Sequence, residues 1–200
     1  MIRRAFVFAL GLSVVAVIGL SAATPDGMTP LHTAALANDE RALIALLKAG
    51  ADSNAANRYG ITPLWLAATN GSASVTRLLL KAGAKANTAL PHGETALMAA
   101  ARTGEPETVR VLIEAGADPD AHETSQGETA LMWAAAENHP EAITALIKGG
   151  AKPNLHAKAL ELAPMDWMNV GMVSTILARG GFTALMYAAR QDSQDAARTG

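Results

Sequence analysis

A five-residue phrase, Gly-x-Thr-[Pro/Ala]-Leu, recurs along the chain at nearly equal intervals. Its copies begin at Gly27, Gly60, Gly93, Gly127 and Gly181, and the first three intervals are 33, 33 and 34 residues. A second phrase, Gly-Ala-[Asp/Lys], keeps the same period and begins at Gly50, Gly83, Gly116 and Gly150. A fixed period of this length indicates structural units that stack, because one such unit cannot bury its apolar side alone.

The first complete period shows how one unit folds. Thr29 can cap a helix with its hydroxyl, and Pro30 suits the first helical position, where a missing N–H is not needed. The pattern predicts a short helix over 31–37. After a turn, apolar residues at helical spacing within 43–47 predict a second helix. Gly50 then ends that helix, because glycine readily takes a positive φ.

These residues resemble the ankyrin repeat. The resemblance rests on Thr-Pro-Leu-His at 29–32, the alanine pair at 34–35, and Leu-Leu-x-x-Gly-Ala-Asp-x-Asn at 46–54. It implies an all-α fold, an ankyrin-repeat solenoid of helix-turn-helix units with projecting hairpin fingers. Later copies replace the histidine by Trp65, Met98, Met132 or Met186. These replacements keep the packing volume, so we expect the fold to survive them.

The period also divides the chain. We expect an ankyrin-repeat domain over 26–200, with repeats at about 26–58, 59–91, 92–125 and 126–158, an insertion at 159–179 and a partial repeat at 180–200. The insertion lengthens one interval between glycines to 54 residues. Its apolar residues after Pro164 predict a helix, which either packs on the last two repeats or forms a methionine-rich lid or partner-contacting finger.

The fifth repeat has the pattern of a first helix over 184–190 and of a second that begins near Asp195. The chain ends at Gly200, where a leucine is expected, so we interpret it as a fragment of a longer repeat protein. We expect a monomer, unless the incomplete repeat leaves an apolar edge through which copies associate.

The N-terminal segment has the layout of a secretory signal peptide. Two arginines precede the sixteen uncharged residues 5–20, and small residues follow at 21–23. We predict a signal peptide over 1–23, cleaved after Ala23, and a periplasmic or secreted protein of bacterial type with no membrane attachment. The alternative is an N-terminal anchor in the inner membrane, since the apolar stretch approaches the roughly 20 residues of a span.

Charge and composition exclude several functions. The net charge is −2 and no run of basic residues occurs, so we expect no nucleic-acid partner. The chain has no cysteine, which excludes a thiol nucleophile, a thiolate metal site and a disulfide framework. Aromatic residues make up 4% and alanine is abundant, a balance that favours closely packed helices over a β-sandwich.

Catalytic signatures are absent from the sequence. It contains no G-x-S-x-G, H-E-x-x-H, phosphate-binding or dinucleotide-binding motif, so we expect no enzyme, no cofactor and no metal. His32 belongs to the repeat phrase and is interpreted as structural. His122 and His156 occupy matching finger positions, but a shared metal ion there is disfavoured by finger spacing of about 10 Å. Glu94 and Glu128 also occupy matching positions and are interpreted as solvated charges.

The resemblance also places a partner-binding surface. The residue two positions after the leucine of the phrase faces the concave side of such solenoids, and a variable pair follows three residues later. With the finger tips, these positions supply the candidate residues Leu66, Arg102, Trp133, Glu137, Tyr187, Arg190, Arg58, Tyr59 and His122. Trp, Tyr and Arg dominate interaction hot spots. The alternative is that Trp133 and Tyr187 fill space beneath the insertion.

We therefore expect a non-catalytic, exported protein–protein interaction module that binds a protein partner through its concave face and fingers. Two other hypotheses stay open. The chain could be the non-catalytic scaffold portion of a larger enzyme, or an effector delivered into a host cell. Fold and composition do not separate these, because one repeat scaffold hosts many functions.

Overall fold

The computed structural model describes residues 24–158 and 181–190. The expected signal peptide, the helix of the insertion and the second helix of the fifth repeat lie outside them. The described residues form nine helices: α1 (Pro30–Leu36), α2 (Glu40–Lys48), α3 (Pro63–Thr69), α4 (Ala73–Lys81), α5 (Ala96–Thr103), α6 (Pro106–Glu114), α7 (Ala130–Ala136), α8 (Pro140–Lys148) and α9 (Ala184–Arg190). None of these helices is long and apolar enough to cross a membrane.

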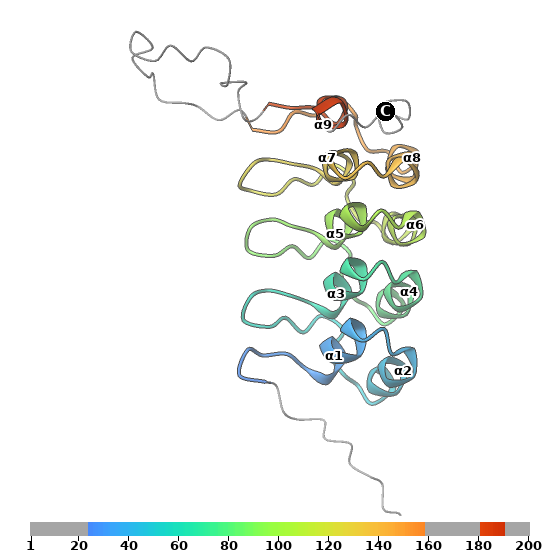
Figure 1. Cartoon of the computed structure of the whole chain (residues 1–200). Helices are drawn as coiled ribbons and strands as arrows, with labels where there is room; N and C mark the ends of the chain where they lie inside the picture. The colour runs from blue at the N-terminus through green and yellow to red at the C-terminus, as the bar shows by residue number, and fades with distance from the viewer. Residues whose placement is uncertain (1–23, 159–180, 191–200) are drawn as a thin grey trace, which may run out of the picture.

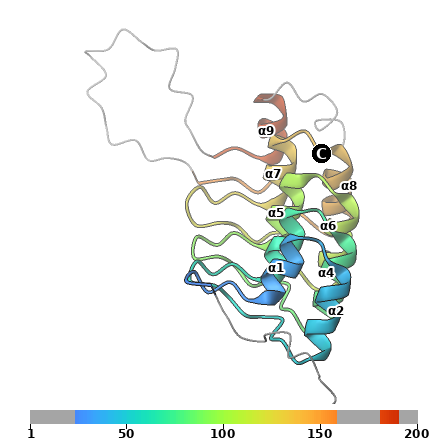
Figure 2. The same ribbon diagram turned by 60° about the horizontal axis from the view of Figure 1, so that its bottom comes forward.

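The helices form two parallel columns, as Figure 1 shows. One column contains α1, α3, α5, α7 and α9, and the other contains α2, α4, α6 and α8. Long loops project from the first column, on the side away from the second, and stack above one another (Figures 1 and 2). The described residues contain no strand, only isolated bridges within two loops. The expected all-α solenoid with projecting fingers is confirmed.

Local sequence explains where the first helix of each unit begins. The hydroxyls of Thr29, Thr62, Thr95 and Thr129 each accept a hydrogen bond from the backbone N–H three residues later. These bonds satisfy donors that a helix start would otherwise leave unpaired. The second helix of the first unit ends before Gly50, which has a φ of +87° as predicted.

Small side chains set the distance between units. The paired alanines of α1, α3, α5 and α7 are buried, which lets helices of the first column approach closely. Leu43, Leu79, Leu112 and Leu146 extend the core into the second column. Met98 and Met132 are also buried, so these two replacements of the phrase histidine keep the packing as expected, whereas Trp65 is partly buried and Met186 is 48% exposed.

His32 joins two repeats, which confirms its structural role. Its Nδ1 lies 2.8 Å from the Thr29 hydroxyl and 3.1 Å from the Thr29 backbone nitrogen. Its Nε2 lies 2.9 Å from the carbonyl oxygen of Ile61, in the next repeat. The imidazole is fully buried, so these bonds satisfy its polar atoms away from water.

Neighbouring fingers are bonded through their backbones. The Thr124 N–H donates to the His92 carbonyl at 2.7 Å. Gly93 permits this approach, because it has a φ of +83° and a Cβ there would lie 3.1 Å from the Glu123 Cα. In the last finger, the Gly181 N–H donates to the Lys158 carbonyl at 3.1 Å. Lys158 and Gly181 therefore lie side by side in this finger.

Candidate binding surface

Two neighbouring hollows lie where the later fingers meet α5 and α7. The first, of about 360 Å³, is here called the finger hollow and is lined by His92, Glu94, Glu123, Ser125, Gln126, Glu128 and Trp133. The second, of about 160 Å³, is called the helix hollow and is lined by Arg102, Glu128, Trp133, Ala136 and Glu137. Because Glu128 and Trp133 line both, the hollows form one surface along the solenoid.

Glu128 fixes the aromatic side chains of this surface. One carboxylate oxygen accepts a hydrogen bond from the Trp133 indole N–H at 2.8 Å, and the other accepts one from the Tyr187 hydroxyl. Trp133 belongs to α7, while Tyr187 belongs to α9 in the next unit. A carboxylate in the finger therefore ties two repeats of the first column to each other, and it holds the indole in one orientation.

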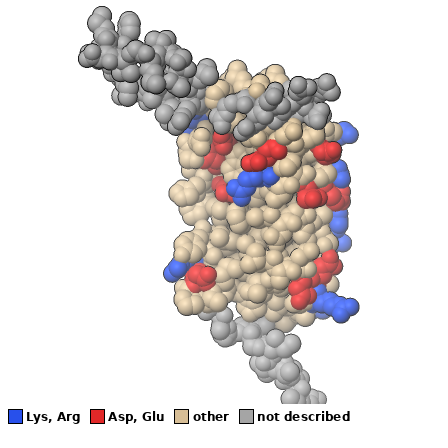
Figure 3. Space-filling model, viewed as in Figure 1, with Lys and Arg blue, Asp and Glu red and all other residues tan. Residues whose placement is uncertain are grey.

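Arg102 covers one side of Trp133. Its guanidinium carbon lies 5.2 Å from the indole centroid, within the range of a cation–π interaction. Its Nη2 also lies 3.9 Å from Glu94 Oε1. In Figure 3, acidic side chains surround a basic one at the level of α5 and α7, whereas the middle of this face at the level of α3 is uncharged. In the middle of this face the charged side chains thus lie at the level of the two hollows, and others line the column of α2, α4, α6 and α8 and the lower fingers.

The pKa of Glu94 is raised in this surface. Burial raises the pKa of Glu94 above its ordinary value, and the positive charge of Arg102 and the nearby indole N–H of Trp65 offset this only in part. The negative charge of Glu123 adds to the increase. The raised pKa means that the ionised form of Glu94 is less favoured in this surface than in water.

The pKa of Glu123 is instead lowered, because groups of its own finger donate hydrogen bonds to its carboxylate. Its side chain is 5% exposed, and its oxygens accept hydrogen bonds from the backbone N–H groups of Ser125 and Gln126 at 2.6 Å each. A third backbone N–H, from Glu128, donates at 3.1 Å. Burial alone would raise the pKa of Glu123, but the Ser125 hydroxyl and these N–H groups bond to its ionised form and hold the pKa below its ordinary value.

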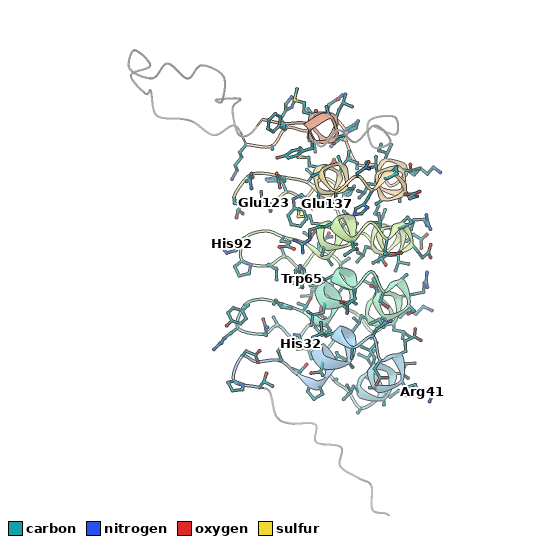
Figure 4. The ribbon with its side chains drawn as sticks, in the orientation of Figure 1. His32, Arg41, Trp65, His92, Glu123 and Glu137 are labelled. Atoms are coloured by element: carbon teal, nitrogen blue, oxygen red, sulfur yellow. The ribbon has the colours of Figure 1, made fainter. Side chains whose placement is uncertain are left out.

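Three residues proposed from the sequence come together here: Arg102, Trp133 and Glu137 line the helix hollow. Figure 4 shows Glu137 at α7 and Glu123 in the adjacent finger. Leu66 and Tyr187 are each only 7% exposed, and Tyr187 reaches this surface through its hydrogen bond to Glu128.

The remaining candidates lie outside the hollows. Arg58 and Tyr59 are exposed in the finger between α2 and α3, where the guanidinium stacks 4.8 Å from the ring centroid. His122 is exposed in the finger between α6 and α7 and lines neither hollow. The side chain of Arg190, at the end of α9, lies outside the described part of the chain.

Glu94 and Glu128 correct a prediction. The sequence indicated solvated finger charges, but both line the finger hollow, and Glu128 is bonded to two aromatic side chains. A signal of this was present in the chain. They occupy the variable position of Gly-x-Thr, where the other repeats have Met28, Ile61 and Phe182. Apolar residues at the equivalent positions indicate that the position faces inward.

No group of three or more His, Asp or Glu side chains among the described residues has the arrangement to hold a metal ion. His122 and His156 are each exposed at a finger. Aromatic and charged side chains line the two open hollows, a combination that suits the binding of a ligand.

Comparison with known proteins agrees with the repeated architecture. A family model described as "Ankyrin repeats (3 copies)" matches the chain over residues 11–89 and again over 85–157. The chain belongs to the ankyrin-repeat family. A search of curated proteins returned no match to it. Ankyrin repeats are typical protein-interaction modules.

Proposed function

We propose that this ankyrin-repeat chain is an exported, non-catalytic module that binds a protein partner through its concave surface and fingers. The observation that carries the proposal is the continuous surface of the finger and helix hollows. Trp133 is held there by Glu128 and stacked by Arg102. A rigid indole beside an arginine has the composition of an interaction hot spot, and little side-chain entropy is lost when a partner docks on it.

A crosslinking pull-down from the envelope fraction of the producing cell tests this function. The baits are the wild-type chain, Trp133→Ala, Arg102→Ala and a matched control, Arg110→Ala. Arg110 is an exposed arginine of α6 that pairs with Glu107 outside the hollows. We expect a partner that is captured by the wild type and by the control and is lost with the other two variants, provided that circular dichroism shows all four folded.

Equal capture by all four baits would place the binding site elsewhere on the chain. If the wild type captures no partner, the proposed binding function is wrong. A partner obtained from host-cell extract, with none from the producer's envelope, would favour delivery of the chain into a host.

Export is a separate part of the proposal and rests on the signal-peptide layout of residues 1–23. We expect a bacterial host that expresses the full chain to release it into the periplasm or medium with Thr24 as the first residue. N-terminal sequencing and cell fractionation measure this. Recovery of the intact N-terminus in the membrane fraction would instead establish an inner-membrane anchor.

A further inference from the structure

The finger hollow combines negative charge with an aromatic wall. Its lining includes the carboxylates of Glu94, Glu123 and Glu128 and the indole of Trp133. The described residues that line it include no lysine or arginine, since Arg102 lines the helix hollow instead. Its volume of about 360 Å³ leaves room for a long side chain, and it is open to solvent.

Neutral groups orient two of these carboxylates. Glu123 accepts from backbone N–H groups and the Ser125 hydroxyl, and Glu128 accepts from an indole and a phenol. Within 24–158 and 181–190, neither carboxylate forms an ion pair. Hydrogen bonds from neutral donors hold a carboxylate in place but leave its charge uncompensated. The hollow is therefore preorganised around negative charge.

The third carboxylate lacks a donor on one oxygen. Glu94 Oε1 is buried and has no hydrogen-bond partner among the described residues. The indole N–H of Trp65 is also buried without a partner, and it lies close enough to this carboxylate to lower its pKa. Arg102 Nη2, at 3.9 Å, is too far for a hydrogen bond. A buried acceptor without a donor is costly. A cationic donor that enters the hollow and draws this carboxylate toward it would remove that cost.

We propose that the finger hollow binds a lysine or arginine side chain from a basic segment of the partner protein, an inference that rests on the function proposed above. The cation would meet three carboxylates and lie beside Trp133, whose indole already accepts Arg102 on its face at 5.2 Å. The finger hollow continues into the helix hollow through Glu128 and Trp133, so a bound chain can extend along the concave surface. This continuity favours a peptide segment over a small free cation.

A random-peptide display selection on the purified full chain tests this inference. Enriched peptides are then synthesised with a fluorescent label, and their Kd is measured by anisotropy against the wild type, Glu94→Gln and Glu114→Gln. Both variants remove one negative charge. Glu114 is exposed on α6 and lines neither hollow, so it is the matched control.

We expect enriched peptides to share a lysine or arginine. Glu94→Gln should weaken their binding by on the order of tenfold, and Glu114→Gln should leave it within about twofold, because screening by solvent weakens the effect of distant charges. Replacing the shared basic residue by alanine in the peptide should weaken binding to the wild type by a similar factor and leave binding to Glu94→Gln nearly unchanged.

Three results would overturn the inference. Enriched peptides without a basic residue, lost with Trp133→Ala, would keep the proposed function but remove the cationic partner. Competition by free arginine at the affinity of the peptide would show a small-cation site. Failure to enrich any peptide would exclude a basic segment as the ligand, while the pull-down would still decide the function separately.

Discussion

At the scale of single residues, the carboxylates of the finger hollow show that position, rather than residue type, decides what a glutamate does. Burial raises the pKa of Glu94, whereas the finger's N–H and hydroxyl donors lower the pKa of Glu123 despite its burial. The two side chains line the same hollow. They differ because burial outweighs the nearby Arg102 charge and Trp65 indole at Glu94, whereas several close backbone N–H groups and a hydroxyl bond to Glu123.

The raised pKa of Glu94 predicts the direction in which stability changes with pH. Between its ordinary and its folded-state pKa, the folded state binds the proton more tightly, so stability falls as pH rises through that window. Ionised Glu94 is therefore destabilising at neutral pH. We expect Glu94→Gln to raise the free energy of unfolding at about pH 7, with a gain that shrinks as the pH falls from the raised pKa toward the ordinary glutamate pKa of about 4.3 and is gone below it. Urea denaturation across that range measures it, and a loss of stability at neutral pH would contradict it.

Gly93 supplies a second prediction at this scale. Alanine at this position would adopt an unfavourable positive φ and also press its Cβ against the Glu123 backbone at 3.1 Å. Gly83 is a matched control, because its φ is +87° but nothing lies within 4 Å of a Cβ there. We expect Gly83→Ala to cost about 1 kcal/mol from the backbone alone. Gly93→Ala should cost at least about 1 kcal/mol more, because it also forces neighbouring fingers apart. Equal losses in urea denaturation would show that the finger contact contributes nothing.

At the scale of elements, one side-chain position links each unit to the next. The Asn87 amide donates to the Gly116 carbonyl and accepts from the Asp118 N–H, both at 2.8 Å. Asn54 makes the same pair of bonds one unit earlier, to the Gly83 carbonyl and from the Lys85 N–H. These bonds satisfy backbone groups that follow the second helix of the next unit, so they fix the register between units.

Removing the hydrogen bonds of Asn87 should destabilise the contact between two neighbouring units. We expect Asn87→Ala to lower the free energy of unfolding by about 1–2 kcal/mol, because it removes two hydrogen bonds. Asn154 occupies the equivalent position one unit after Asp120, and the described residues give it no side-chain hydrogen bond, so Asn154→Ala should cost under about 0.5 kcal/mol. Urea denaturation monitored by circular dichroism compares the two, and a larger loss for Asn154→Ala would refute the assignment.

At the scale of the whole molecule, stability comes from contacts between neighbouring units. Helices of the first column contact their immediate neighbours in order, as do those of the second (Figure 1). In such a stack, stability is close to a sum of unit and interface terms. The last described helix, α9, packs on α7 and leaves Leu185 54% exposed. Local stability should therefore vary along the stack.

Native-state hydrogen exchange measures that variation. We expect the slowest exchange in α5 and α6, which have neighbouring units on both sides, and the fastest exchange in α9. Ala99, Ala100 and Ala101 of α5 are all fully buried, which supports this order. Uniform protection from α1 to α9 would instead indicate that the stack unfolds as a single cooperative unit.

The sequence alone determined the repeat period, the helix starts and the family resemblance. These features depend on local chemistry: a threonine caps the helix that directly follows it, and a glycine ends the helix that directly precedes it. The first helix of the fifth repeat was predicted over 184–190, which is the range of α9. The structural role of His32 followed from the same phrase.

Only the tertiary structure decided which side chains meet across repeats. It buried Leu66 and Tyr187, and it turned Glu94 and Glu128 from expected solvated charges into the lining of the finger hollow. Glu128 and Tyr187 are separated by 59 residues, yet the phenol donates to the carboxylate. The physical reason is that burial and pKa depend on the neighbouring repeat, whose side chains at equivalent positions differ in size and charge while the backbone period stays the same.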